Sequence, residues 1–454
     1  MGNAAVSLSQ AAAWCGGRVA PEFEDTCFCG ANFDTRRLQP GELFVAIKGA
    51  RNGHEFVPAA IKAGAAAVLA SEDLPWEVPA IYVKDTIKAL QEIAAGYRGT
   101  LSCRCVGITG SVGKTTTKEM IAAVLETTFK TQKTAENYNN DIGVPVSVLS
   151  LDRDCQAAVL EMGMNHKGEL SVLTRITKPD IAIITNVGTM HIENLGSREG
   201  ILQAKLEILE GLRPGGTVIF CGDNDLLQRE AEKYSAVLFG LGENNDVRAD
   251  NIKEKDGKLS FRILTGGKEI PVTLPVTGEH NVLNALCAAA VGLQMGVPAE
   301  NIQAGLQNFH NTGMRQNIYE KNGVTVIADC YNAGPESMKA ALNVLGRQKG
   351  RRIAVLGGML ELGDYAEEAH FEVGTEAAMC ADLLFAYGPC SEKYVEGARK
   401  FKMASAQNFE THEELAAALR KTIRKGDVLL FKGSHGMHME KVLEMLQLQS
   451  EGDN

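Results

Sequence analysis

Apolar and polar positions along this chain repeat in two ways. Short apolar runs bounded by glycine or polar turns predict buried strands, and such runs lie at 157–161, 181–185 and 217–220. Longer segments with apolar residues every three or four positions predict helices, as at 199–212 and 281–295. Strands that alternate with helices are typical of a parallel sheet with helical crossovers. We therefore expect such a sheet between residues 101 and 313.

The same patterns predict a smaller unit before this region and a further unit after it. Residues 1–100 mix short elements, with a strand at 41–48 and a helix at 56–63. From residue 314 the alternation restarts, with strands at 324–328, 352–356, 383–387 and 428–431 and a final helix at 437–448. We predict three α/β domains: a small one at 1–100, a central parallel-sheet domain at 101–313 with an antiparallel patch at 249–277, and a Rossmann-like, doubly wound domain at 314–454.

One glycine-rich stretch carries the clearest chemical signal. It reads GITGSVGKTTTKE at 107–119, between an apolar run at 103–108 and a helical segment at 116–129. Glycines let backbone N–H groups approach phosphate oxygens, and the start of a helix adds partial positive charge. Lys114 would reach the β- and γ-phosphates, while the Thr115 hydroxyl would bind Mg²⁺. The expected ATP contacts are Thr109, Gly110, Ser111, Gly113, Lys114, Thr115 and Thr116. The spacing departs from the general pattern, which has glycine where this chain has Ile108.

Two polar residues follow strands of the same predicted sheet. Glu161 comes at the end of the apolar run 157–160, and a carboxylate at the carboxyl end of a parallel strand is well placed to hold Mg²⁺. By itself such a residue is more often a solvated charge, but the neighbouring triphosphate motif favours metal binding. His191 follows the next strand and could bind a metal through one ring nitrogen. A loop histidine more often has no such role, so that alternative stays open.

Further polar residues lie where they could contact a nucleotide. Arg315 stands between the two larger α/β units and could bind a transferring γ-phosphoryl group. Asp329 follows a predicted strand and could accept ribose hydroxyls, whereas Asn281 opens a helix and could cap it or contact a base. Lys205 lies on a predicted helix with Leu206, where an exposed lysine is the ordinary interpretation.

Composition excludes several classes of function. The 454 residues are 45% apolar and carry a formal charge of −10, from 46 Lys and Arg against 56 Asp and Glu. Without a dense basic run, a nucleic-acid surface is not expected. No apolar run is long enough to span a membrane. A secretory signal has basic residues before its apolar run, and none precedes the apolar patch at 11–15. The 11 cysteines lack C-x-x-C spacing, which favours reduced thiols in the cytosol.

Together these residues resemble the Mur ligase family, ATP-dependent amide-forming enzymes of bacterial peptidoglycan precursor synthesis. The segments that carry the resemblance are TGSVGKTTTKEM at 109–120, NNDIGVP at 139–145, EMGMNHKGE at 161–169, LGGMLELG at 356–363 and KGSHGMHME at 432–440. The Asp-Asn-Pro-Arg segment of diaminopimelate-adding relatives is absent. The resemblance implies ligation of D-alanyl-D-alanine to UDP-N-acetylmuramoyl-tripeptide through an acyl phosphate, with release of ADP and phosphate.

The resemblance also implies roles for individual residues. Thr35, Arg36 and His54 match a UDP-binding first domain, and Asn137, Asn139 and Asn140 match a segment that faces the muramoyl-peptide. Thr115, Glu161, His191 and Lys205 match the Mg²⁺ ligands, with Lys205 carbamylated by CO₂, so that a cation becomes an anionic oxygen ligand. Asn281, Arg315, Asp329 and Asn332 match ATP contacts, and Lys114, Lys205, His191 and Arg315 form the catalytic set. The third domain would bind the dipeptide. The implied protein is a monomer in the bacterial cytoplasm, with small molecules as its partners.

Three departures from the family pattern concern the third domain. Gly334 stands where Asn is common, Gly358 where Asp is common, and His435-Gly436 where Arg-Ser is usual. These changes affect the expected ATP and dipeptide contacts more than the reaction. Two alternatives stay open: a sibling Mur-type or folylpolyglutamate-type ligase with another amino-acid substrate, and a nucleotide-binding regulator without turnover.

Overall fold

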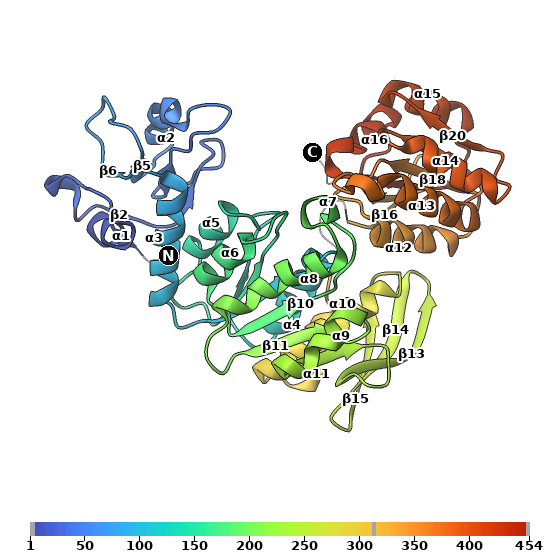
Figure 1. Cartoon of the computed structure of the whole chain (residues 1–454), viewed down its shortest axis with the longest axis horizontal. Helices are drawn as coiled ribbons and strands as arrows, with labels where there is room; N and C mark the ends of the chain where they lie inside the picture. The colour runs from blue at the N-terminus through green and yellow to red at the C-terminus, as the bar shows by residue number, and fades with distance from the viewer. Residues whose placement is uncertain (1–4, 311–314, 451–454) are drawn as a thin grey trace.

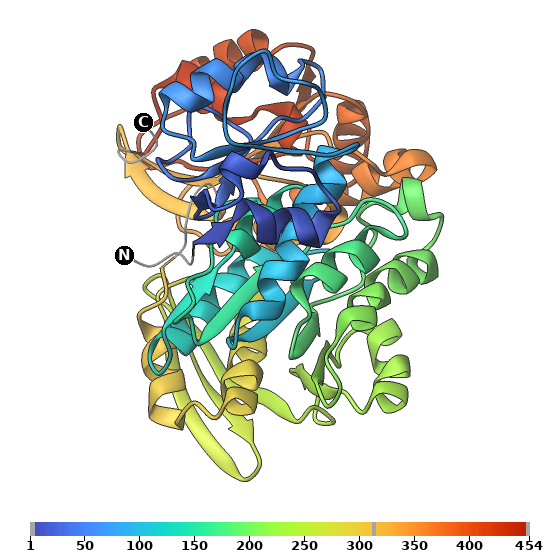
Figure 2. The same ribbon diagram turned by 90° about the vertical axis from the view of Figure 1, so that its left-hand side faces the viewer.

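The computed structural model describes residues 5–310 and 315–450, which form three α/β units (Figure 1). The first unit (blue) and the last (orange to red) lie on the same side of the central unit (green to yellow), as the turned view in Figure 2 also shows. The α/β fold class predicted from the sequence is confirmed. The predicted boundary between residues 313 and 314 lies outside the described residues.

The first unit is built on a small parallel sheet. Its strands follow the order β3-β4-β5-β6 and span Ala31–Asn32, Leu43–Val45, Ala67–Ala70 and Ala80–Tyr82. A two-stranded antiparallel ribbon joins β1 (Val6–Ser7) to β2 (Cys27–Phe28), and the helices are α1 (Leu8–Cys15), α2 (Val57–Lys62) and α3 (Thr86–Thr100). Since β4 and β5 are fully buried, their apolar runs form the core of this unit.

The central unit contains a sheet of nine strands in the order β15-β14-β13-β12-β11-β10-β7-β9-β8. The strands span β7 Arg104–Thr109, β8 Thr131–Lys133, β9 Ala157–Glu161, β10 Ile181–Ile184, β11 Thr217–Cys221, β12 Val237–Gly240, β13 Val247–Lys255, β14 Lys258–Thr265 and β15 Lys268–Leu274. All neighbours in the series β8-β9-β7-β10-β11-β12-β13 pair in parallel. The pairs β13-β14 and β14-β15 are antiparallel. The antiparallel strands expected at 249–277 are therefore present, as an extension of the main sheet.

Helices cover both faces of this sheet. One face carries α4 (Lys114–Glu126), α10 (His280–Met295) and α11 (Ala299–Gln307), and the other carries α5 (Gly143–Leu149) and α6 (Glu169–Thr177). The remaining helices are α7 (Ile192–Leu195), α8 (Arg198–Leu206) and α9 (Asp225–Ala231). Because β7 lies between β9 and β10, the carboxyl ends of three consecutive parallel strands meet at one edge. The order in which strands are added to the sheet reverses at β7, and ligands bind at such a point in open α/β sheets.

Helix α3 connects the first unit to the central one. It packs against α1 on one side and against α5 and α6 on the other. Arg98 on this helix is fully buried, and its guanidinium donates hydrogen bonds to the carbonyl oxygens of Thr177 (2.8 Å) and Cys103 (3.2 Å). The Tyr97 hydroxyl donates to the carbonyl oxygen of Leu151 at 2.6 Å. These buried contacts tie the end of α3 to the central unit.

The last unit has a six-stranded sheet in the order β16-β17-β21-β18-β19-β20, in which only β16 is antiparallel to its neighbour. The strands span β16 Asn317–Lys321, β17 Val324–Asp329, β18 Arg352–Gly357, β19 Leu383–Tyr387, β20 Ala406–Phe409 and β21 Val428–Lys432. The helices are α12 (Pro335–Gly346), α13 (Ala366–Cys380), α14 (Ser391–Lys400), α15 (His412–Thr422) and α16 (Glu440–Leu446).

Several predicted boundaries differ from those observed. The helix expected at 116–129 begins at Lys114, because the left-handed Gly113 (φ 84°) is its N-cap, and it ends at Glu126. The helix expected at 199–212 changes after Leu206 into a 3₁₀ helix at Glu207–Gly211. The helix expected from residue 437 begins at Glu440, since His438 is left-handed (φ 49°).

No helix within residues 5–310 or 315–450 combines the length and apolar character that crossing a bilayer would need.

Candidate functional site

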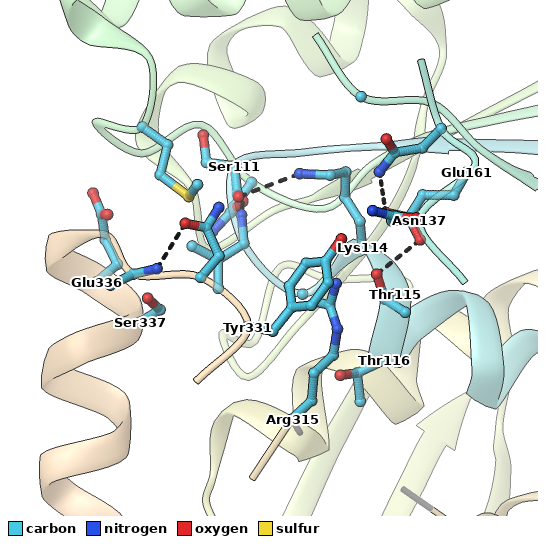
Figure 3. Close-up of a pocket in the computed structure, with 18 of the residues that line it drawn as sticks. Ser111, Lys114, Thr115, Thr116, Asn137, Glu161, Arg315, Tyr331, Glu336 and Ser337 are labelled. Atoms are coloured by element: carbon cyan, nitrogen blue, oxygen red, sulfur yellow. Dashed lines mark hydrogen bonds between the residues drawn. The ribbon is translucent and has the colours of Figure 1, made fainter. Parts of the chain in front are cut away.

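A cavity of about 650 Å³ lies between the central and last units (Figure 3). Its volume is within the range of small-molecule sites. Its walls come from the carboxyl ends of β7, β9 and β10, the start of α10 and the start of the last unit. The predicted site residues that line it are Ser111, Gly113, Lys114, Thr115, Thr116, Asn137, Asn139, Asn140, Glu161, His191, Asn281, Arg315, Asp329 and Asn332. The cavity therefore gathers residues that are far apart in the sequence.

The loop between β7 and α4 requires glycine at two positions. Gly110 has φ 154°, and a Cβ atom there would lie 1.9 Å from Thr185 Oγ1. At Gly113, with φ 84°, a Cβ atom would lie 2.9 Å from Asn284 Oδ1. A side chain at either position would collide with its neighbour in a conformation that L-residues rarely adopt. The two glycines thus let the loop pass close to β10 and α10.

The end of β10 holds this loop in place. The backbone N–H of Gly188 donates to Ser111 Oγ at 3.0 Å, and the N–H of Val112 donates to Asn186 Oδ1 at 2.8 Å. Thr109, at the end of β7, is fully buried. The loop is therefore preorganised by its neighbours, as a phosphate cradle needs to be.

Lys114 begins α4 and turns back over the loop, where it lines the cavity (Figure 3). Its Nζ donates to the carbonyl oxygens of Gly110 (2.7 Å) and Ser111 (3.4 Å). Burial lowers the pKa of Lys114, the carboxylate of Glu161 opposes this shift, and the Arg315 guanidinium adds to it. The ammonium group therefore lies among polar groups that an incoming phosphate could replace.

Thr115 and Glu161 meet at the floor of the cavity (Figure 3). The Thr115 hydroxyl donates to Glu161 Oε2 at 2.8 Å, and Asn139 Nδ2 donates to Oε1 at 2.9 Å. The side chain of Glu161 is buried, and its backbone N–H donates to Thr134 Oγ1 at 3.0 Å. This hydroxyl and this carboxylate supply the oxygen donors that Mg²⁺ prefers.

Lys118 supports Glu161 and was not singled out from the sequence. It lies one helical turn after Lys114 and is only 1% exposed. Its Nζ lies 3.9 Å from Glu161 Oε2 and 3.2 Å from Glu119 Oε1, and it donates to the carbonyl oxygen of Thr134 at 2.8 Å. The sequence signal that could have pointed to Lys118 is its place in the Lys118-Glu119 pair at the end of the glycine-rich motif.

His191 precedes α7 and lies at the border of the last unit. Its backbone is left-handed (φ 65°), and its Nδ1 lies 2.5 Å from Oε2 of Glu361. The hydrogen bond from His191 lowers the pKa of Glu361. Glu361 was quoted within a motif but received no role from the sequence.

Lys205 is buried on α8, contrary to the exposed position that the helical pattern alone suggests. Within the described ranges, its Nζ has neither a hydrogen bond nor an ion pair. Burial moves the pKa of Lys205 well below its usual value, and the charge of Lys114 adds to this shift. The side chain does not line the cavity itself.

The last unit presents several of the predicted ATP contacts. The guanidinium carbon of Arg315 lies 3.8 Å from the centre of the Tyr331 ring, so that the two side chains are stacked (Figure 3). Asp329 accepts a hydrogen bond from the buried Lys432 (2.7 Å), whose Nζ also donates to the carbonyl oxygen of Asn332 (2.9 Å). Lys432 thus also lines the cavity; it was quoted within a motif but received no role from the sequence.

Two predicted asparagines make contacts that shape the local backbone. Asn281 Nδ2 donates to the carbonyl oxygen of Thr277 at 2.7 Å and to Gln316 Oε1 at 3.1 Å, which joins α10 to the start of the last unit. Asn140 Oδ1 accepts from the backbone N–H of Gly143 at 2.8 Å, at the start of α5. Both still border the cavity.

The predicted UDP-binding residues lie in the first unit and do not line the cavity. Arg36 pairs with Asp34 at 2.6 Å, and this partner lowers the pKa of Asp34 to about 2. His54 is buried, with Nδ1 2.7 Å from Asn52 Oδ1 and Nε2 accepting from the backbone N–H of Ser71. Thr35 is half-buried beside Arg36.

A contact links this region to the cavity wall. Arg37 donates to Glu136 (2.8 Å) and to the Tyr138 hydroxyl (3.3 Å). Glu136 and Tyr138 flank Asn137, one of the predicted substrate-facing residues. The loop that carries Thr35 and the segment that carries Asn137 are therefore neighbours.

The three departures from the family pattern have distinct surroundings. A Cβ atom at Gly334 would lie 2.7 Å from Met190 Cγ, and one at Gly358 would lie 2.8 Å from the carbonyl oxygen of Pro389. Near Gly436 the closest atom is Leu360 Cδ1 at 3.1 Å, at the end of a flexible side chain. Only at Gly358 does rigid backbone exclude a larger residue.

Fold and site together define a class of protein. It is a multidomain α/β enzyme with a nucleotide-binding glycine-rich loop in one domain and a second α/β domain that forms the other side of the cavity. Three family models match the sequence, described as Mur ligase family, catalytic domain (residues 30–98), Mur ligase middle domain (108–292) and Mur ligase, glutamate ligase domain (314–435). The chain belongs to the Mur ligase family of ATP-dependent ligases.

Individual relatives are similar over almost their whole length. The UDP-N-acetylmuramoyl-tripeptide–D-alanyl-D-alanine ligase of Bacillus subtilis is 41% identical over 435 residues, which cover 94% of each chain. The ligase of the same description from Escherichia coli is 38% identical, over 91% of this chain and 92% of its own. The crystal structure of MurF from Acinetobacter baumannii superposes with a TM-score of 0.90 at 32% identity, over 99% of this chain and 100% of its own. A MurF ligase from Thermotoga maritima in complex with ADP gives 0.82 at 29%, over 92% and 97%.

Proposed function

We propose that this chain ligates D-alanyl-D-alanine to UDP-N-acetylmuramoyl-tripeptide at the expense of ATP. The products are UDP-N-acetylmuramoyl-pentapeptide, ADP and phosphate, as in peptidoglycan precursor synthesis. The observation that carries the proposal is the meeting of Thr115 and Glu161 at 2.8 Å, beside Lys114, in a cavity that Arg315 borders from the last unit. The similarity to ligases of this description over nine-tenths of the chain supports the same substrates.

The reaction proceeds in two steps. The terminal carboxylate of the tripeptide attacks the γ-phosphorus of ATP, which forms an acyl phosphate and releases ADP. The free amine of the dipeptide then attacks the acyl carbon, the new amide loses a proton, and phosphate leaves with its bonding electrons. Lys114 and Arg315 offset the charge that moves with the phosphoryl group. Loss of one such cationic contact lowers rates by about 10²–10⁵-fold.

The metal site would use residues from three strand ends. Thr115, Glu161 and His191 supply a hydroxyl, a carboxylate and an imidazole at the cavity wall. Within the described ranges, no cluster of three His, Cys, Asp or Glu side chains forms a site for an ion. This sparse set fits Mg²⁺, which keeps few protein ligands and is shared with phosphates. When bound, Mg²⁺ would neutralise charge on the phosphate oxygens.

Lys205 acts as a carbamate in this proposal. Its neutral amine combines with CO₂, which forms an N–C bond and releases one proton, so that a side chain without negative charge becomes an anionic oxygen donor. A lysine that is buried without a partner favours the neutral amine that this reaction needs. Incubation with ¹³C-bicarbonate should produce a carbamate ¹³C resonance in the wild type, and the Lys205→Ala variant should lack it.

The three units divide the substrates between them. Residues 1–100 bind the UDP part through Thr35, Arg36 and His54, and Asn137, Asn139 and Asn140 guide the peptide toward the cavity. The contact of Arg37 with Glu136 supports this path, because it places the two segments side by side. Residues 101–313 bind ATP, and residues 314–454 bind the dipeptide. A monomeric state and a cytoplasmic location remain predictions.

Mass spectrometry of the products tests this proposal. Purified protein with Mg²⁺, ATP, UDP-N-acetylmuramoyl-tripeptide and D-alanyl-D-alanine should yield the pentapeptide and an equal amount of ADP. Lys114→Ala should remove both products, and near-normal ADP release from it would refute the assignment. Product formation with a single amino acid in place of the dipeptide would indicate a sibling ligase. The absence of acceptor-stimulated ATP hydrolysis would indicate a regulator.

A further inference from the structure

The loop before α7 is held by the last unit at two points. The backbone N–H and the hydroxyl of Thr189 donate to Oε1 of Glu336 on α12, at 3.0 and 3.1 Å. Two residues further, His191 Nδ1 lies 2.5 Å from Oε2 of Glu361, which lies between β18 and the 3₁₀ helix Gly363–Tyr365. Between them, Met190 occupies the space above Gly334. This docking interface joins the central sheet edge to the last unit.

The contact with Glu361 determines which ring nitrogen of His191 is available. Its Nδ1 faces a carboxylate, which accepts but does not donate, so the ring proton resides on Nδ1. The other nitrogen, Nε2, has no hydrogen bond with any residue in 5–310 or 315–450, and the side chain as a whole is only 12% exposed. A neutral imidazole protonated at Nδ1 carries its lone pair on Nε2. Metal-binding histidines commonly have such a carboxylate partner.

We propose that Glu361 is a positioning residue that fixes the tautomer and orientation in which His191 binds Mg²⁺ through Nε2. Since Glu361 belongs to the last unit, docking of that unit completes the metal site on the central unit. The position of the dipeptide-binding unit thereby affects how tightly the phosphoryl-transfer site holds its metal. This inference rests on the proposed function, because it takes His191 as a metal ligand.

The backbone of His191 shows why a positioning contact is needed. A non-glycine residue in the left-handed conformation costs free energy and persists only where surrounding contacts determine it. The two carboxylates supply such contacts, one at Thr189 and one at the ring of His191. They differ in one respect: Glu361 contacts the imidazole, whereas the hydrogen bonds of Glu336 go to Thr189. A variant of each therefore separates positioning of the ring from docking of the unit.

The first test measures Mn²⁺ affinity of the full chain, with Mn²⁺ as a probe for Mg²⁺ and a non-hydrolysable ATP analogue present. Electron paramagnetic resonance of free Mn²⁺ should show a loss of about 10–100-fold in Glu361→Ala, as for other carboxylate partners of metal-binding histidines. Glu361→Gln should retain most of the affinity, since its amide oxygen still accepts from Nδ1. Asp364→Ala is the matched control: this exposed carboxylate lies in the same segment, and its side chain has no hydrogen bond or ion pair with the described residues.

Two outcomes would overturn the proposal. One is a Glu361→Ala affinity within twofold of the wild type, and the other is an equal loss in Glu336→Ala, which would reduce both contacts to docking. Because Glu361 is 46% exposed, its removal leaves no buried charge and should not prevent folding.

A second readout reports the tautomer directly. In protein labelled with ¹⁵N-histidine, the resonances of His191 are those missing from the spectrum of His191→Gln. In the wild type they should indicate an Nδ1–H tautomer, and in Glu361→Ala they should change. An Nε2–H tautomer in the wild type would contradict the proposal. These results are independent of ligation: Mn²⁺ and tautomer effects without pentapeptide formation would refute only the proposed substrates.

Discussion

Replacement of Lys118 by methionine should destabilise the central unit strongly. Lys118 is 1% exposed and its Nζ lies 3.9 Å from Oε2 of Glu161, which is equally buried. Without the ammonium, the carboxylate keeps only the neutral donors Thr115 and Asn139. The variant therefore leaves the buried carboxylate without its ion-pair partner, and only the more distant charge of Lys114 remains near it.

The distance sets the size of the effect. Two unit charges 3.9 Å apart interact with about 4 kcal/mol at an effective dielectric constant near 20. Removal of one partner from a buried pair costs about 3–5 kcal/mol. For a unit of roughly 200 residues, each kcal/mol of lost unfolding free energy lowers the midpoint of thermal unfolding by about 2–4 °C. We therefore expect this midpoint to decrease by about 10 °C.

Thermal unfolding followed by calorimetry checks this expectation. The matched control is Lys130→Met, which also removes a lysine between two carboxylates, Asp152 at 3.1 Å and Asp154 at 2.5 Å, but at a site 45% exposed. Such surface pairs contribute at most about 1 kcal/mol. Equal midpoints for the two variants would refute the reasoning. Added Mg²⁺ and ATP should reduce the difference in unfolding midpoint between Lys118→Met and the wild type, because a divalent cation would then bind beside Glu161.

Three further predictions concern buried positions. Lys205→Met should abolish ligation yet raise the free energy of unfolding in CO₂-free buffer. The folded-state pKa of Lys205 lies below its ordinary 10.5, so in that window the unfolded chain binds an extra proton and wild-type stability rises with pH. Urea titrations at several pH values should thus show the advantage of the variant shrinking toward pH 10.5. Gly358→Ala should lower stability by about 1–3 kcal/mol in the same assay, since its Cβ atom would lie 2.8 Å from the Pro389 carbonyl oxygen. Gly110→Ala should weaken ATP binding at least about tenfold by calorimetry, because its Cβ atom would lie 1.9 Å from Thr185 Oγ1. Unchanged stability or affinity would contradict the respective argument.

Sequence patterns predicted the strands that are buried on both faces. Ala157–Glu161 and Leu383–Tyr387 were found with their correct bounds, because strands inside a parallel sheet form continuous apolar runs. The strands Asn317–Lys321 and Ala406–Phe409 were missed. Both lie at the edges of the last sheet, where one side faces solvent and the residues are largely polar.

The candidate site was predictable where its chemistry is local. The glycine-rich loop is one continuous segment, and Glu161 follows directly from the end of a strand. The role of Glu361 depends on a contact between residues 170 positions apart, which no local pattern encodes. The burial of Lys205 depends on which elements pack over α8, so the helical period alone favoured the wrong environment.

The central claim is that the tripeptide carboxylate is activated by phosphoryl transfer in the cavity that Lys114, Thr115 and Glu161 line. The most direct measurement uses UDP-N-acetylmuramoyl-tripeptide with both oxygens of its terminal carboxylate labelled by ¹⁸O. After one turnover with ATP and D-alanyl-D-alanine, mass spectrometry of the released phosphate should find one ¹⁸O atom per molecule. Unlabelled phosphate accompanying pentapeptide formation would contradict the account.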